Sequence, residues 1–203
     1  MSCTIPMQDI EKAKEFHGHW CSGLALGIRV AELALREVGR STDEEVVALT
    51  ECDMCAVDAI QFLVSCTFGK GNLICRDHGK AVFSFWRRRD GKGIRISRKT
   101  LSRPEDPRVG ELNRKKQEGT LTEEEAVLLR ENREEKCRYL MEAPLEELFT
   151  WKRLEEGPPP RAAIEPSSPC ECCGELVMAS RLRRGEDGKS YCIPCFEKKF
   201  RKG

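Results

Sequence analysis

Four cysteines near the C-terminus constrain this chain more than any other feature, because they form two C-x-x-C pairs with eighteen residues between them. The pairs are Cys170 with Cys173 and Cys192 with Cys195. Structural Zn²⁺ takes four sulfur or nitrogen ligands in a tetrahedron, and a two-residue spacer lets one tight turn direct two thiolates at the same ion. So short a segment buries too little apolar surface to fold alone. We therefore predict that these four cysteines bind one structural Zn²⁺ in a small domain, residues 169–203.

The residues around the two pairs indicate how this domain folds. Gly174 lets the backbone turn beneath the ion, and the turn sequence GEDGKS at 185–190 predicts a hairpin that returns the chain to the second pair. Pro194 suits the first turn of a helix through residues 196–200. This order of elements resembles a treble-clef zinc finger, in which Cys172 is not a ligand. Basic residues of such a tail are commonly only solvated surface, so we do not expect nucleic acid as a partner.

The chain contains twelve cysteines, so their interpretation depends on the redox state of the compartment. Residues 1–20 lack the basic and apolar regions of a signal peptide, and no stretch approaches the roughly 18 apolar residues that a membrane span requires. We therefore expect a cytoplasmic protein without a membrane partner, in which reduced cysteines serve as metal ligands or reactive thiols. The formal net charge of +1 argues neither for nor against nucleic acid.

Hydrophobic periodicity predicts an α+β core domain over residues 1–104. We expect a helix from Leu24 to Gly39, a strand at 46–50 and a second helix within 52–66. The sequences GNLICRD, AVFSFWRRR and KGIRIS then indicate strands, and Asp90–Gly91 is suited to a hairpin turn between the last two. The predicted fold class is an α+β core domain with a helical arm and a small C-terminal treble-clef-like zinc finger.

The composition changes after the core, and residues 105–156 predict the helical arm. Thr122 and Glu125 form a capping-box pattern ahead of a long, charged helix. Pro144 fits the first turn of a further helix, which we expect to continue through Leu154. Residues 157–168 are rich in proline, which lacks the N–H donor that helices and sheets need, so they predict an extended linker.

The sequence FHGHWCSG indicates a second site, in the core domain. It places His17, His19 and Cys21 at alternate positions, where an extended or turning backbone would present them on one side. Imidazole and thiolate bind Zn²⁺ and similar transition metals, and three protein ligands leave one coordination position open for water or substrate. Alternatively, Cys21 is a reactive thiol without a metal, because the start of the following helix favours its thiolate.

Cys52 and Cys55 form a further C-x-x-C pair, at a position between a strand and a helix that dithiol oxidoreductases also use. One of the two thiols could instead complete the histidine site. The negative charge of Asp53 disfavours thiolates beside it, which argues against the redox interpretation. The structural alternative is that these cysteines only fill the core and the histidines only make local hydrogen bonds.

Three sequences, FHGHWCSGLALGIR, CDMCAVDAIQFLVSCTFGKGNL and RDHGKAVFSF, together with the cysteine tail, resemble the E-subunit family of formylmethanofuran dehydrogenase. The resemblance implies an α+β core that forms homodimers. It also implies an active or metal site that gathers His17, His19, Cys21 and Cys55. Departures from the family pattern are Ser22 in place of proline, Cys52 in place of asparagine and Ala56 in place of glycine.

The family name comes from an operon for carbon dioxide reduction in methanogenesis, yet the chain has no cluster-binding spacing of the ferredoxin type. We therefore expect an accessory role, beside an accessory protein partner, and not the dehydrogenase reaction. The leading hypothesis is a metal-binding protein with a structural zinc and a core site. That site holds a second transition metal or uses Cys21 and Cys55 as catalytic thiols. The alternatives are a non-enzymatic zinc-finger adaptor or nucleic-acid-associated regulator, and a dithiol oxidoreductase.

Overall fold

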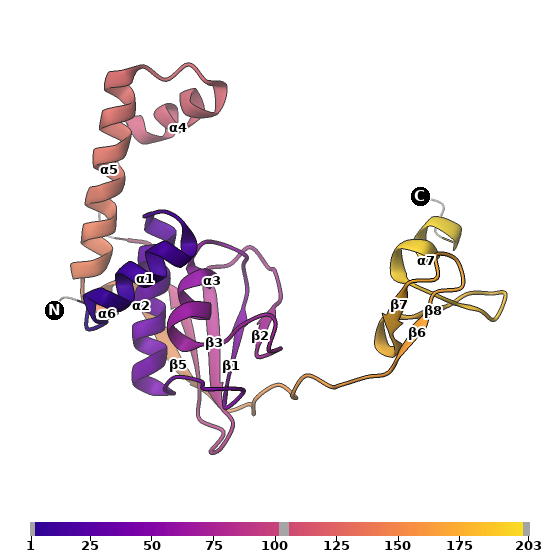
Figure 1. Ribbon diagram of the computed structural model, residues 1–203. Coiled ribbons are helices and arrows are strands. Elements are labelled where there is room, and N and C mark those ends of the chain that lie inside the picture. The colour runs from indigo at the N-terminus through magenta and orange to yellow at the C-terminus, as the bar shows by residue number, and fades with distance from the viewer. Residues whose placement is uncertain (1–2, 102–105, 201–203) are drawn as a thin grey trace. The chain divides into compact units, whose positions relative to one another are not determined.

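The computed structural model describes residues 3–101 and 106–200, and the chain divides into two compact units, Met1–Arg161 and Ala162–Gly203 (Figure 1). Each unit has its own hydrophobic cluster. No helix within the described ranges is both long and apolar enough to cross a membrane.

A five-stranded sheet is the centre of the first unit, with strand order β2-β1-β3-β4-β5. Only β1 and β2 are parallel, and the other neighbours are antiparallel. Asp90–Gly91 lies in the turn between β3 and β4, as predicted, and Gly91 adopts a positive φ of 68° there. The strands are β1 Val46–Thr50, β2 Leu73–Cys75, β3 Val82–Arg87, β4 Gly93–Arg98 and β5 Phe149–Leu154.

Helices cover one face of this sheet (Figure 1). The predicted helix after Cys21 is α2 (Ser22–Glu37), and the helix after Cys55 consists of α3 (Ala56–Ala59) continued by the π-helical η1 (Ile60–Val64). An additional helix, α1 (Met7–His17), precedes them and was not predicted from the sequence.

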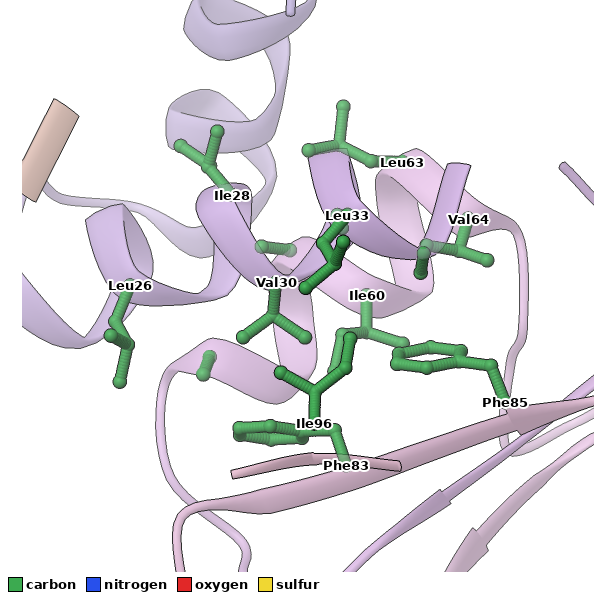
Figure 2. Close-up of a cluster of buried hydrophobic side chains, with 14 of the residues drawn as sticks. Leu26, Ile28, Val30, Leu33, Ile60, Leu63, Val64, Phe83, Phe85 and Ile96 are labelled. Atoms are coloured by element: carbon green, nitrogen blue, oxygen red, sulfur yellow. The ribbon is translucent and has the colours of Figure 1, made fainter. Parts of the chain in front are cut away.

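The main core lies between α2, α3, η1 and the sheet (Figure 2). Phe83 pairs with Ile96 and Phe85 with Ile94 across β3 and β4, and all four side chains belong to this core. Burying such a side chain contributes about 1.5–3 kcal/mol. Gly27 of α2 is required by this packing, because a Cβ there would lie 2.5 Å from the Ala56 backbone. The helices α2 and α3 are therefore held close together at this point. Both helices carry residues of the metal centre described below.

The charged segment after the core forms the helices α4 (Arg108–Glu118) and α5 (Glu123–Glu142). Thr122 and Glu125 make both hydrogen bonds of the predicted capping box at the start of α5. The C-terminal end of α5 is anchored by the buried Arg29 of α2, whose guanidinium donates to the carbonyls of Met141 at 2.6 Å and Ala143 at 2.9 Å. This anchor places α5 against α2, beside the residues that follow Cys21.

The expectation of a helix through Leu154 was wrong. The helix after Pro144 is the short α6 (Leu145–Leu148), and the chain then enters β5, which pairs with β4 along its whole length. The sheet edge satisfies the backbone groups of β5, and this tertiary pairing overrides local helix propensity. Leu148 and Phe149 are fully buried in the main core at this change of direction.

The predicted linker begins on the first unit and ends in the second. Arg88 donates to the carbonyl of Pro159 at 2.6 Å, so residues up to Pro159 lie along the sheet. Ser167 and Ser168 already belong to β6 of the second unit. The second unit contains β6 Ser167–Pro169, β7 Leu176–Met178, η2 Ala179–Arg181, β8 Arg183–Arg184, β9 Ser190–Tyr191 and α7 Ile193–Phe200.

Candidate metal centre

The corner between α1 and α2 brings the two histidines and Cys21 together. His17 is the last residue of α1, and Gly18 ends the helix with a φ of 89°, which a side chain would strain. Two residues after His19, Cys21 becomes the N-cap of α2, and its Sγ accepts a hydrogen bond from the Leu24 N–H at 3.3 Å. Of the two backbone forms expected here, extended or turning, the structure has the turning one, with a helix end, a reversal and a helix start.

The geometry of these side chains suits a transition-metal ion. One ligand atom each from His17, His19 and Cys21 lies within 4.8 Å of the other two. The His17 Nε2 to Cys21 Sγ distance is 3.7 Å. A tetrahedral Zn²⁺ with ordinary bond lengths would separate such a pair by about 3.6 Å. The His17 side chain is only 8% exposed, whereas His19 is exposed, so the cluster opens on the His19 side.

Asp58 fixes the orientation of His17. Its Oδ2 lies 2.7 Å from His17 Nδ1, so the proton of the imidazole resides on the Nδ1 side and Nε2 remains available toward Cys21. A carboxylate that orients a histidine in this way is a recurrent feature of metal sites. The sequence did not lead us to predict Asp58 as a site residue. It lies on α3, three residues after Cys55, and therefore on the same helical face.

Cys55 lies beside Cys21 but outside the group of three. A Cβ added to Gly23 would be 3.5 Å from Cys55 Sγ and 3.7 Å from Cys21 Sγ, so both thiols flank this glycine. The same Cβ would meet the Cys55 Cβ at 2.9 Å, which explains why residue 23 is glycine. Burial raises the pKa of Cys55, and the neighbouring Cys21 raises it further.

Cys52 occupies a different environment from Cys55. It is buried, and the Cys75 thiol contacts its carbonyl oxygen at 3.9 Å. Burial raises the pKa of the Cys52 thiol, opposite to the lowered pKa of an attacking redox cysteine. Cys137 of α5 is buried in the main core, and its pKa is raised to about 11 by that burial and next by the charge of Cys21.

The four tail cysteines form a closed site of a different kind. All four Sγ atoms lie within 4.8 Å of one another, and Cys173 Sγ is 3.9 Å from Cys192 Sγ. The edge of a tetrahedron with 2.3 Å Zn–S bonds is about 3.8 Å. Gly174 turns the backbone with a φ of 75°. The backbone N–H groups of Cys173 and Cys192 lower the pKa of Cys170 to about 6, which favours the thiolate that zinc binds.

The hydrophobic cluster of the second unit is built on these ligands. Its buried members are Cys170, Tyr191 and Cys192, and the partly buried Phe196 and Phe200 pack against them. Lys199 donates to Asp187 at 2.7 Å and to the Tyr191 hydroxyl at 2.7 Å, which ties α7 to the hairpin. Because half of the ligands are also core residues, loss of the ion would remove the centre of this unit.

Comparison with known proteins agrees with both parts of the chain. Residues 16–150 match the family described as FmdE, molybdenum formylmethanofuran dehydrogenase operon. Residues 164–199 match the prokaryotic dksA/traR C4-type zinc finger. The four tail cysteines thus form a C4 zinc finger, as predicted.

Two individual proteins are similar to this chain. A protein from Archaeoglobus fulgidus described as "Probable S-adenosyl-L-methionine-binding protein" is 36% identical over 195 residues, which cover 91% of this chain and 51% of the relative. The chain therefore spans about half the length of that protein. A crystal structure of a tungsten formylmethanofuran dehydrogenase FmdE-like protein from Syntrophus aciditrophicus has the same fold. It matches with a TM-score of 0.58 and 22% identity, over 96% of this chain and 93% of that chain.

Proposed function

The chain belongs to the FmdE family. We propose that its core domain contains a metal centre, in which His17, His19 and Cys21 are the protein ligands. The observation that carries the proposal is the chain of contacts from Asp58 through His17 to Cys21, at 2.7 and 3.7 Å. A histidine held by a carboxylate and aimed at a thiol at a tetrahedral edge length suits a divalent transition metal better than it suits simple packing.

A divalent ion with three protein ligands supplies a Lewis acid and one open coordination position for water or substrate. Neighbouring residues orient the ligands around that coordination position. Asp58 holds the proton on the far nitrogen of His17, and the N–H of Leu24 stabilises negative charge on Cys21. Cys55 lies beside Cys21, and both thiols flank Gly23.

Metal content of the purified full chain tests this proposal. We expect two ions per chain, one in each unit, and one ion per chain in a variant with His17→Ala and Cys21→Ala. The matched control is His78→Ala with Cys75→Ala, since both are exposed and belong to neither cysteine cluster. A wild-type content of one ion, or an equal loss in the control variant, would contradict a core metal centre.

The dithiol alternative receives less support. Burial raises the pKa of both Cys52 and Cys55, so neither is prepared as a nucleophile at neutral pH.

A further inference from the structure

A cavity of about 630 Å³ lies between the sheet and the arm, apart from the metal ligands. Lys80 before β3, Arg98 at the end of β4 and Lys99 after it contribute from the sheet side. Lys136 and Tyr139 contribute from α5. Four of these five side chains are cationic. No acidic residue is among the lining residues that belong to the described part of the chain.

The positive charge of the cavity is not fully used by the protein itself. Lys99 donates to the carbonyl of Glu146 at 2.7 Å. The side chains of Lys80 and Arg98, by contrast, make no hydrogen bond or ion pair with any other residue that the structure describes. Lys136 already interacts with another residue, so Lys80 and Arg98 are the cations that remain for a ligand. Cationic groups that converge on a concave space attract anions, and guanidinium and ammonium groups suit phosphate and carboxylate oxygens. Ala81, Val82 and Leu101 add an apolar wall to the same cavity.

A smaller cavity of about 100 Å³ lies beside this basic space, on the side of the candidate centre. Its lining includes Arg98 and Lys136, which also line the large cavity, and Ser22 and Gly23, which follow Cys21. The thiols of Cys21 and Cys55 lie within 3.5–3.7 Å of the position that a Gly23 Cβ would occupy. The two cavities are therefore adjacent, with cations in the large one and, in the lining of the small one, a glycine that both thiols flank.

We propose that these two adjacent cavities bind the substrate of the core centre, a small molecule with an oxyanion at one end and an apolar or aromatic body. Lys80 and Arg98 bind the phosphate or carboxylate oxygens, and Tyr139 and the apolar wall contact the body. The opposite end of the molecule then points toward Gly23, Cys21 and Cys55. The assignment as a substrate rests on the proposed function of the centre, whereas the binding of the anion does not.

Calorimetric titration of the full chain with phenyl phosphate tests this assignment. We expect saturable binding that weakens at least tenfold, about 1.4 kcal/mol, in a variant with Lys80→Ala and Arg98→Ala. The matched control, Lys152→Ala with Arg153→Ala, removes the same charges from exposed positions of β5 outside the cavity and should change the affinity less than twofold. Equal weakening in both variants would overturn the proposal, because it would indicate only a general effect of net charge.

Further ligands sharpen the chemical class. Benzoate in place of phenyl phosphate distinguishes a carboxylate from a phosphate as the preferred oxyanion, and binding of either supports the proposal. Inorganic phosphate should bind more weakly than phenyl phosphate, and Tyr139→Ala should remove that difference. S-adenosyl-L-methionine carries a carboxylate and an aromatic base, but also a cationic sulfonium and an ammonium group. Tighter binding of S-adenosyl-L-methionine than of phenyl phosphate, unchanged in the Lys80→Ala and Arg98→Ala variant, would overturn the proposal, because the ligand would then not be held through its oxyanion.

The same titration, read together with the metal content, distinguishes an error in the cavity assignment from an error in the proposed metal centre. The variant with His17→Ala and Cys21→Ala should still bind phenyl phosphate, because neither residue lines the basic space. If the wild-type chain holds two metal ions but no phenyl phosphate or benzoate, the cavity assignment is wrong and the metal centre stands. If it binds the anion but holds one ion, the cavity is an anion site and the core metal is wrong.

Discussion

The two cysteine-containing clusters differ in what surrounds their ligands. In the tail, Cys170 and Cys192 are two of the three buried core residues, and four thiols enclose the site. In the first unit, His17, His19 and Cys21 lie at the margin of a large hydrophobic core and are not among its buried members. A domain that needs an ion in order to fold uses all coordination positions of that ion for protein ligands. A domain that folds through its own hydrophobic packing can leave one position open. The tail ion therefore serves structure, and a core ion would be available for chemistry.

Metal removal should produce the largest difference between the two regions. Structural zinc supplies on the order of 10–16 kcal/mol to a small domain at neutral pH. After exhaustive chelation we expect residues 162–203 to become sensitive to protease, while the unit 1–161 keeps a cooperative thermal transition. Limited proteolysis with mass spectrometry follows both regions in one sample.

Single substitutions provide the controls for this experiment. Cys173→Ser should reproduce the effect of chelation on the tail, and Cys172→Ser should leave the tail protected, because Cys172 is exposed and is not one of the four clustered thiols. If the tail stays protected from protease after chelation, although its cysteine thiols have been alkylated, then the two regions do not differ in how their folding depends on metal.

Substitution of Asp58, which orients His17, should have a smaller effect on metal binding than substitution of the ligands themselves. Asp58→Asn keeps the size of the side chain but removes the charge that holds the proton on His17 Nδ1. Loss of such a partner typically lowers metal affinity by about 10–100-fold. We expect this decrease at the core site and none at the tail, measured by competition with a chromophoric chelator. Asp53→Asn, at an exposed position just before α3, is the control, and an equal decrease there would contradict the orienting role of Asp58.

Local sequence patterns predicted those features whose physics is local. Two C-x-x-C pairs with a glycine define a zinc knuckle, Thr122 and Glu125 cap a helix, and Asp90–Gly91 closes a hairpin. Each depends on residues within a few positions of each other. The resemblance to the FmdE family then pointed to the residues of the core site.

Features that depend on distant pairing were not predictable in this way. The strand β5 has a sequence compatible with a helix and is extended only because β4 offers it an edge. Asp58 meets His17 across 41 positions in the sequence, and Cys137 reaches the neighbourhood of Cys21 only because Arg29 anchors α5. The cavity between Arg98 and Tyr139 likewise exists only after the arm has packed against the core.

Anomalous X-ray scattering from crystals of the full chain decides whether the core holds a metal. Data are needed at the zinc edge and at the edge of any other transition metal found by a fluorescence scan. We expect two peaks per chain, one among Cys170, Cys173, Cys192 and Cys195 and one bonded to His17 Nε2, His19 and Cys21 Sγ. A single peak in the tail, with His17 Nε2 bonded only to protein atoms or water, would contradict the core metal centre.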